Sequence, residues 1–417
     1  MKVVVLGAGV IGISTAYELA CDGHDVIVVD RCEDVALETS NANGGQLSSD
    51  HGEPLAAPGV IRKAIKWLGK HDAPLLYRLR LDPQLWSWTL QFMSNCKDPL
   101  FWDNAAHILR LSLYSRQRIR DILARETIAF DRLSTGILTL YHNDKDFNVA
   151  LNNVQSMKEL GSVREILDRK GCIEHEPALE FSSAPISGGI FTPNDESGDC
   201  YLFTKALAEC CRRRGVQFQF NTTVTTIERK DWRVKSVQTD KGPIEADVYV
   251  LALGSYSPLF VQELGLNLPI YPAKGYSVTV PVKDDTKAPK TSITSKDYKL
   301  VFSRLGNKLR VAGMLEFNGY DTNLDASRAR VVLENALKLF PRAADRDHAE
   351  FWTGLRPQTP DSVPILGRAR QENLVLNTGH GMLGWTMAMG SARIAADLAA
   401  HRAPEIDVDG FGWERFA

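Results

Sequence analysis

The stretch VVVLGAGVIG, residues 3–12, decides the fold, because four apolar residues run directly into a turn that contains three glycines. A short apolar run bounded by a glycine turn is typical of a buried strand. Apolar residues then recur with helical spacing over residues 13–20, and a second apolar run, residues 26–29, ends at Asp30. The sequence therefore predicts a strand, a helix and a second strand at its start.

The glycines and the acid of this unit predict a dinucleotide site. Gly7, Gly9 and Gly12 permit a tight turn and let a pyrophosphate approach the helix N-terminus closely. A carboxylate at the position of Asp30 can bind a ribose. A unit of this kind without a ligand is the alternative, but three glycines would then weaken the helix start without any gain in packing. The pattern does not by itself separate NAD from FAD.

Three later segments favour FAD. Residues 38–48, ETSNANGGQLS, form a polar loop rich in glycine that suits backbone contacts with phosphate and a flat ring. Residues 246–257 predict a buried strand that ends in a glycine turn. Residues 374–398 predict a strand, a glycine-rich turn and a helix whose N-terminus can face an anionic ligand atom. Nucleotide-binding pieces are thus spread along the whole chain, as in flavin enzymes with an inserted substrate domain.

The predicted fold class is α/β, with a Rossmann-like FAD-binding domain and a discontinuous α+β substrate domain built on an antiparallel sheet. We place residues 1–80, 195–260 and 352–417 in the FAD-binding domain and residues 81–194 and 261–351 in the substrate domain. The residues expected to bind the cofactor are Gly7, Gly9, Gly12, Asp30, Arg31, Ser40, Asn41, Asn43, Gly44, Gly45, Val224, Gly254, Gly379, His380, Gly381, Leu383 and Gly384.

The composition excludes several other classes of protein. The chain has 417 residues and a formal net charge of -2, so it offers no basic domain for nucleic acid. Its seven cysteines are scattered without a Cys-x-x-Cys pair, which predicts a reduced, cytoplasmic protein, and we expect no metal site. Glu18 and the glycine spacing argue against a signal peptide, and no apolar run reaches the roughly 18 residues needed to span a bilayer.

Six strings carry a resemblance to a known family: ETSNANGGQLS, LAAPGVIRKAIKW, PNDESGDC, YPAKGYSVTVP, FWTGLRPQTPD and NTGHGMLGWTMAMGS. With them the chain resembles, over essentially its whole length, the FAD-dependent D-amino acid oxidase and dehydrogenase superfamily, and most of all the small subunit of the bacterial D-amino acid dehydrogenases. The resemblance implies oxidative deamination of a D-amino acid to a 2-oxo acid and ammonia, with electrons passed to a quinone or other carrier.

Three alternatives stay open at this point. The first is a related flavin enzyme that acts on a secondary amine such as glycine, sarcosine, D-proline or hydroxy-D-proline. The second is a flavoprotein subunit that serves mainly in electron transfer, and the third is an NAD-binding protein.

The resemblance also implies roles for single residues. Arg356 in the Gly-Leu-Arg-Pro string would hold the substrate carboxylate above the flavin, whereas a structural arginine capped by Asp361 or by a C-terminal carbonyl is the alternative. Gly354 stands where sarcosine-oxidase-type relatives carry a flavinylated cysteine, which implies non-covalent FAD. Those relatives also place an oxygen-activating lysine where this chain has Val311 or Ala312, which implies a slow reaction with oxygen.

Tyrosines on predicted strands supply candidate pocket hydroxyls. They are Tyr271, Tyr276 and Tyr298, although tyrosine in a strand is more often packed than catalytic. We select Tyr276 as the second catalytic candidate beside Arg356.

Two polar segments leave alternatives open. Residues 60–80 hold six Lys and Arg against one acid among apolar residues, including Leu68, so they form either a peripheral contact with the inner face of an anionic membrane or a solvated helix with one face in the core. His51 and Glu53 follow the flavin loop. They either favour a cationic or hydroxylated substrate side chain or are solvated surface residues.

Overall fold

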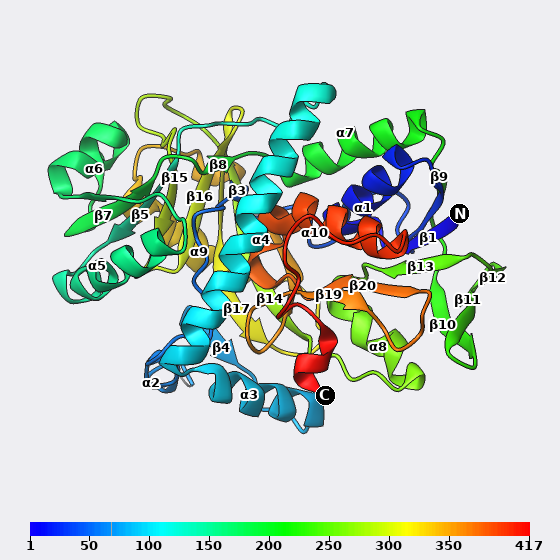
Figure 1. The fold of residues 1–417 in the computed structure, drawn as a ribbon. Helices are drawn as coiled ribbons and strands as arrows, with labels where there is room; N and C mark the ends of the chain where they lie inside the picture. The colour runs from blue at the N-terminus through cyan, green and yellow to red at the C-terminus, as the bar shows by residue number, and fades with distance from the viewer. Residues whose placement is uncertain (68) are drawn as a thin grey trace.

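The computed structural model describes residues 1–67 and 69–417, and its first sheet is the predicted nucleotide-binding unit. This sheet has the strand order β19-β20-β13-β1-β2-β9, in which all neighbours run parallel except β19 at one edge (Figure 1). Its strands are β1 (Lys2–Leu6), β2 (Asp25–Val29), β9 (Gln217–Gln219), β13 (Val248–Leu251), β19 (Ile365–Arg368) and β20 (Leu374–Thr378).

The two faces of this sheet are covered differently. Val3 and Val5 of β1 pack against helices, whereas Val4 and Leu6 belong to a separate apolar cluster on the opposite face, as the alternation of a strand requires. The helical face is covered by α1 (Val10–Cys21), α7 (Cys200–Arg213) and α10 (Gly384–Ala399). The opposite face is covered by α8 (Ser257–Val261) and by a three-stranded sheet of β10 (Val224–Lys230), β11 (Arg233–Thr239) and β12 (Gly242–Ile244).

A second, nine-stranded sheet forms the other part of the molecule. Its order is β18-β14-β17-β16-β15-β5-β7-β6, and β4 pairs with β17. All pairs are antiparallel except β15 with β5 and β17 with β4. The strands are β4 (Leu75–Tyr77), β5 (Ile137–Tyr141), β6 (Glu165–Leu167), β7 (Gly188–Thr192), β14 (Tyr271–Pro281), β15 (Ser292–Ser295), β16 (Leu300–Leu305), β17 (Lys308–Phe317) and β18 (Glu350–Gln358).

These two sheets confirm the predicted fold class. The strand pairing, however, assigns two segments to the other sheet from the one that we predicted. β4 and most of β18 fall within residues 1–80 and 352–417, yet both belong to the nine-stranded sheet. Strand pairing is a long-range property that the local composition does not reveal. The sheet of the substrate part therefore extends into segments that we had placed in the FAD-binding domain.

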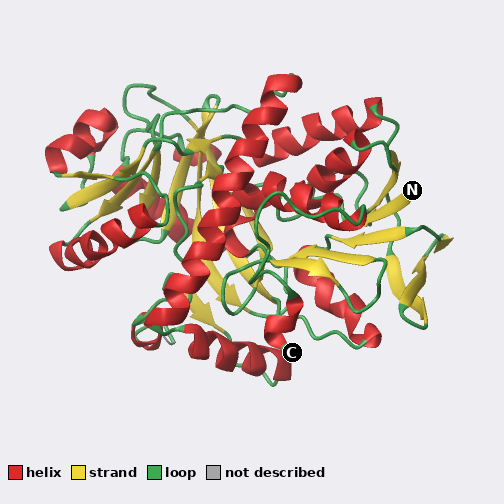
Figure 2. Cartoon of the chain, viewed as in Figure 1, coloured by secondary structure: helices red, strands yellow, loops and turns green. Residues whose placement is uncertain are grey.

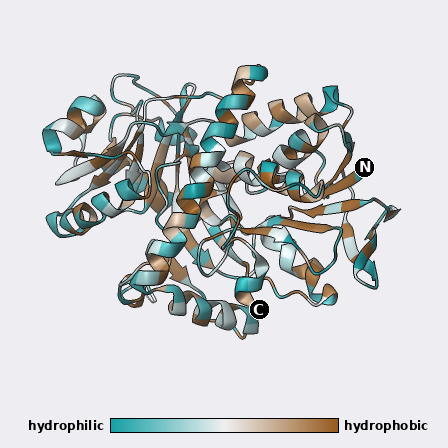
Figure 3. Ribbon diagram, viewed as in Figure 1, coloured by the Kyte–Doolittle hydropathy of each residue, from teal (hydrophilic) through white to brown (hydrophobic). Residues whose placement is uncertain are grey.

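Further helices surround the second sheet and connect it to the first (Figure 2). α4 crosses the front of the molecule and packs on α10 of the first part, and its hydrophobic and hydrophilic stretches alternate (Figure 3). α9 covers β14 and β17 on one face of the nine-stranded sheet. The helices are α2 (Val60–Ile65), α3 (Pro83–Asn95), α4 (Asp98–Arg125), α5 (Asp144–Glu159), α6 (Arg169–His175) and α9 (Ala326–Leu339), and a small ribbon pairs β3 (Gln46–Leu47) with β8 (Glu196–Ser197).

Candidate functional site

One cavity of about 1770 Å³ joins the two parts of the molecule. Its wall includes Gly7 and Gly9 after β1 and also Arg356 on β18. Most of the residues predicted to bind the cofactor line it, but Gly12, Asn41, Gly45 and Gly379 do not. Segments far apart in the sequence therefore meet around one space that is large enough for a dinucleotide and a small substrate.

The glycine turn leaves the start of α1 open toward this cavity. A Cβ on Gly12 would lie 1.9 Å from the carbonyl oxygen of Gly7, so Gly12 serves the close packing of turn and helix. Gly9 caps α1 without a side chain, and the first turn of α1 contains no acid. The carboxylate of Asp30 accepts hydrogen bonds from the backbone N–H groups of Ala8 at 2.6 Å and Cys32 at 2.8 Å. The positive end of α1 is thus free to face an anion.

The polar loop of residues 38–48 is pinned to both parts of the molecule. Ser40 Oγ accepts a hydrogen bond from the backbone N–H of Val10 at 3.1 Å, on the nucleotide side. On the other side, Ser303 Oγ donates to the carbonyl oxygen of Gly44 at 2.8 Å, and Arg310 Nη1 donates to that of Asn43 at 3.1 Å. These bonds hold the loop as a rigid wall of the cavity.

Two further segments line the nucleotide end. Arg31 forms an ion pair with Glu38, and its guanidinium carbon lies 4.1 Å from the ring centre of Tyr256. Val224 and Gly254 also border the cavity there.

The turn before α10 brings an uncharged histidine to the cavity. His380 is buried, and this burial lowers its pKa to about 3, so the imidazole is neutral near pH 7. In the described part of the chain its Nε2 has no hydrogen-bond partner, and neither has the neighbouring Oε1 of Gln358. A Cβ on Gly381 would lie 2.8 Å from that oxygen. A buried polar atom without a partner beside a cavity can bond to a ligand.

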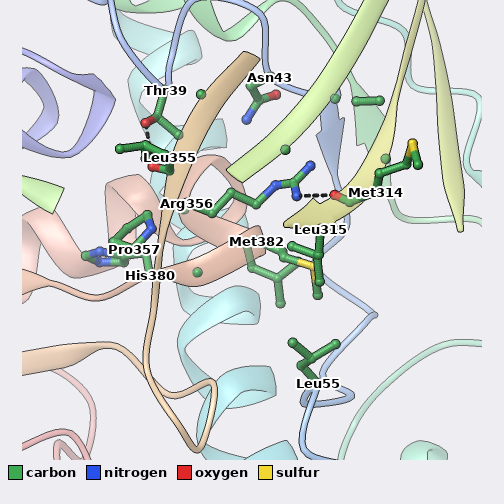
Figure 4. Close-up of a pocket in the computed structure, with 18 of the residues that line it drawn as sticks. Thr39, Asn43, Leu55, Met314, Leu315, Leu355, Arg356, Pro357, His380 and Met382 are labelled. Atoms are coloured by element: carbon green, nitrogen blue, oxygen red, sulfur yellow. Dashed lines mark hydrogen bonds between the residues drawn. The ribbon is translucent and has the colours of Figure 1, made fainter. Parts of the chain in front are cut away.

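Arg356 projects from β18 across the cavity face of the nine-stranded sheet (Figure 4). Its Nη1 donates a hydrogen bond to the carbonyl oxygen of Met314 at 2.8 Å. The guanidinium lies against the backbone of Gly275, where an added Cβ would stand 2.4 Å from Cζ and 2.5 Å from Nη1 and Nη2. The absence of a side chain at Gly275 therefore leaves the space that the guanidinium occupies.

No carboxylate lies within ion-pair distance of Arg356 in residues 1–67 and 69–417. Asp361, the alternative partner, instead pairs with Arg415 at 2.7 Å. Enclosure by the cavity walls lowers the pKa of Arg356 to about 10, because the charged form loses hydration. The guanidinium is therefore a cation without an anionic partner, as an anion-binding site requires.

A β-bulge prepares the carbonyl that holds Arg356. The pairing of β14 with β17 shifts between Lys274 and Tyr276, opposite Met314. Met314 has φ 56°, which is rare for a residue with a side chain. At this interruption of the ladder the Met314 carbonyl accepts the hydrogen bond from the guanidinium. Such local strain is concentrated at functional sites.

A model of a protein family described as FAD dependent oxidoreductase matches residues 2–398. The chain belongs to this family. It is 49% identical to a D-amino acid dehydrogenase of Paramagnetospirillum magneticum, over 100% of this chain and 99% of the relative. It is 43% identical to that of Granulibacter bethesdensis, over 100% of both chains.

Solved structures of this fold include glycine oxidase from Bacillus cereus, with TM-score 0.73, 21% identity and coverage of 97% of this chain and 96% of that chain. L-proline dehydrogenase from P. horikoshii gives TM-score 0.76 and 18% identity, with coverage of 100% and 97%. The family match and the full-length relatives confirm the predicted family, the FAD cofactor and the prediction that the protein is an oxidoreductase.

The cavity fits the FAD of this family. The open start of α1 suits a pyrophosphate, and the neutral His380 and the glycines beside it suit a flat, uncharged ring. A Cβ on Gly44 would lie 2.7 Å from a methyl group of Val301, so this position tolerates only glycine without local movement. The cationic guanidinium of Arg356 borders the same cavity.

Tyr276 does not present its hydroxyl to this cavity. Although Tyr276 borders the cavity, its side chain is 1% exposed and its hydroxyl donates to Glu316 Oε2 at 2.6 Å. Tyr276 pairs with Gly313, and Glu316 lies on the face covered by α9, opposite to the face of Arg356. This geometry corrects the prediction that Tyr276 supplies a pocket hydroxyl. Tyr271 is likewise engaged, since its hydroxyl donates to Asp82 at 2.7 Å.

His51 and Glu53 both line the cavity, so they are not solvated surface residues. Glu53 forms an ion pair with Arg164 at 2.6 Å, which holds the pKa of Glu53 well below its usual range. His51 contacts Asp195 Oδ2 through Nδ1 and Thr139 Oγ1 through Nε2, both at 3.0 Å. Because Arg164 already neutralises Glu53, a cationic substrate side chain finds no free carboxylate there.

Proposed function

We propose that the chain is an FAD-dependent D-amino acid dehydrogenase that converts D-amino acids to 2-oxo acids and ammonia. The observation that carries this proposal is the unpaired guanidinium of Arg356 at the wall of the flavin cavity. The D-amino acid dehydrogenases that match it over full length, at 43–49% identity, support this activity.

Arg356 would bind the substrate carboxylate with the N–H groups that Met314 leaves free. Leu55, Leu315 and Met382 line the cavity on one side of the guanidinium (Figure 4), where apolar side chains would help to exclude water from the reacting carbon. Bound FAD supplies the chemistry, because it accepts the hydride from the substrate Cα. The chain needs no strong base if the amine enters neutral, so its main contribution is orientation. The imino acid then hydrolyses in water.

A panel of D-amino acids with an artificial dye acceptor tests this function. We expect dye reduction and anaerobic bleaching of the flavin with several primary D-amino acids and not with their L enantiomers. Bleaching by glycine, sarcosine or D-proline alone would replace the proposal by the secondary-amine alternative. Bleaching by none of them in the purified chain would favour a subunit that only transfers electrons.

We further propose that the FAD is non-covalent and that the electron acceptor is a quinone or another carrier. Gly354 offers no thiol, and a Cβ there would lie 2.1 Å from the indole of Trp352. On β17, Ala312 faces the cavity while Val311 is buried in the core beside α9, so neither provides a lysine for oxygen activation. We expect much faster turnover with a quinone analogue than with oxygen. Hydrogen peroxide formed as fast as the dye is reduced would contradict this.

An exposed apolar surface near the cavity supports a peripheral membrane contact. Seven large apolar side chains between residues 65 and 100 are exposed: Ile65, Leu79, Leu81, Trp86, Leu90, Met93 and Leu100. α2 has no buried residue, so it is not a helix with one face in the core, and it also lines the cavity. Leu68 lies outside the described residues. Within those residues, no helix is both long and apolar enough to cross a bilayer.

We propose that this surface contacts an anionic membrane, where basic residues add to apolar burial and α2 leads a quinone to the cavity. Replacing Lys63 and Lys66 by Glu should reduce sedimentation with anionic vesicles. Lys158 and Lys170, exposed on α5 and α6, provide a control with the same charge change. Equal sedimentation of both double variants and the parent protein would contradict the membrane contact.

A further inference from the structure

The flavin cavity contains a second group of unpaired cations. Lys296 and Lys299 both line it, in the hairpin between β15 and β16. Across the described ranges, neither Nζ atom has a hydrogen bond or an acid within 4.0 Å, the ion-pair limit. Two acids at this cavity are already engaged, since Glu53 binds Arg164 at 2.6 Å and Asp146 binds Lys63 at 3.1 Å.

The register of the sheet brings this hairpin close to Arg356. Leu300 of β16 pairs with Gly313 of β17, so in antiparallel pairing Lys299 stands beside Met314. Met314 is the residue whose carbonyl holds the guanidinium of Arg356. Adjacent strands are about 4.8 Å apart, which is comparable to the length of a short amino-acid side chain. A small molecule bound at Arg356 can therefore reach the strand position of Lys299, and Lys296 follows the other arm of the same hairpin.

The carboxylates around Lys299 do not neutralise it. Burial, together with the charges of Lys296 and Lys63, lowers the pKa of Lys299 to about 8. Asp297 and Asp146 act in the opposite direction but do not restore the ordinary value. Asp297 accepts hydrogen bonds from the backbone N–H of His142 and the amide of Asn143, and Asp146 is shared with Lys63. Lys299 is exposed where it borders the cavity, and Lys296 is half-buried, so both ammonium groups are accessible to a bound anion, which would favour their charged form.

We propose that Lys296 and Lys299 form a second carboxylate-binding subsite, and that D-amino acids with an acidic side chain are the preferred substrates. The inference rests on the proposed D-amino acid oxidation. Arg356 binds the α-carboxylate, and the two lysines bind the carboxylate of the side chain. Glu53, which also lines the cavity, does not repel this group because Arg164 neutralises it.

Matched substrate pairs test the subsite. D-glutamate and D-glutamine, like D-aspartate and D-asparagine, have nearly the same shape and differ by one charge. We expect the parent enzyme to prefer the acid of each pair in kcat/KM. Lys299→Met should lower the acid-to-amide ratio about tenfold, as expected for one charged hydrogen bond, and Lys296→Met should also lower it. Each ratio cancels effects on protein folding and FAD content.

Lys308→Met provides the control for charge. Lys308 is exposed at the start of β17, outside the cavity, and its replacement removes the same positive charge. An unchanged ratio in this variant supports a local subsite. A ratio that falls as much as in Lys299→Met would overturn it, because long-range attraction of anions would then explain the preference.

A binding measurement gives a readout without turnover. Glutarate or butyrate is added to the FAD-loaded protein, and binding is monitored by the change in flavin absorbance. We expect the dicarboxylate to bind more tightly, and Lys299→Met to reduce this difference. If D-glutamine and D-alanine are oxidised but the lysine variants leave both ratios and the glutarate preference unchanged, the subsite is wrong and the proposed function stands. If no D-amino acid reduces the flavin, the proposed function itself fails, and the subsite fails with it.

Discussion

Replacing Gly275 by Ala should displace the guanidinium of Arg356 without removing any charged group. The new methyl carbon would lie 2.4 Å from Cζ of Arg356 and 2.5 Å from both terminal nitrogens. Ordinary contacts between such atoms begin at about 3.5 Å, so the guanidinium must move by roughly 1 Å. That movement lengthens the 2.8 Å bond from Nη1 to Met314 and turns the fork away from the bound carboxylate.

The expected cost follows from the lost interaction. A hydrogen bond that involves a charged group contributes about 1.5–3 kcal/mol, and about 1.4 kcal/mol corresponds to a tenfold change. We therefore expect kcat/KM for D-alanine to fall by about 10- to 150-fold. FAD content should stay near that of the parent protein, because the contact is with the arginine. Gly367→Ala is the control, since it also lies in a strand and its Cβ would meet only an ordinary contact at 3.7 Å.

The assay is steady-state dye reduction by each variant, with and without Arg356→Met in the same chain. In the Met background the Gly275→Ala change should have little further effect, because the group that it displaces is absent. The reasoning is refuted if Gly275→Ala lowers kcat/KM by the same factor in both backgrounds, or if it leaves the parent enzyme unaffected. Loss of FAD in the single variant would also refute it, because Gly275 would then serve the cofactor.

Three further outcomes are expected. Arg356→Lys keeps the charge but loses the planar pair of N–H donors, so kcat should fall and KM should rise. Arg356→Met should lose most of the parent's preference for D-alanine over an amine without a carboxylate. If the Met variant retains that preference, Arg356 is structural. Acid denaturation should release intact FAD, and flavin that precipitates with the chain would contradict this. Asp30→Ala should weaken FAD retention, because the Asp30 carboxylate also holds the glycine turn through the backbone N–H of Ala8. The ratio of kcat/KM for D-glutamate to kcat/KM for D-glutamine should decrease as the pH rises through about 8, because Lys299 is cationic below its pKa and neutral above it. A ratio that does not change between about pH 6 and pH 10 would argue against a charged contact.

The sequence predicts the nucleotide end well because its signals are local. The glycine turn, the start of α1 and Asp30 lie within one short segment, and the structure assembles them as the spacing indicates. Arg356 is predicted by a family string, and the cavity location is consistent with that prediction. Gly275 carried a signal that was not used. A glycine inside the strand YPAKGYSVTVP indicates a close approach of other atoms, and these atoms prove to be the guanidinium of Arg356.

Other features depend on pairing between distant strands, which the sequence does not contain locally. The side-chain direction of Tyr276 is set by a bulge opposite Met314, and its partner Glu316 is reached only across the sheet. Lys296 and Lys299 stand in a polar turn, SKDYKL, which is typical of a solvated hairpin. Their position at the cavity wall depends on the tertiary arrangement of the chain, which the local sequence does not show.

A comparison of two arginines on opposite faces of the nine-stranded sheet supports the proposal that Arg356 binds a ligand. Arg328 is 0% exposed on the α9 face, and the chain surrounds it with partners: Glu316 at 3.3 Å, the ring of Tyr276 at 5.4 Å and the carbonyl oxygens of Ala73 and Leu315. For Arg328, the chain therefore supplies both an anion and several acceptors. Arg356 has a single neutral acceptor among the described residues and faces a cavity. Because an enclosed cation without an anion is costly, a bound carboxylate is the group that would complete its surroundings.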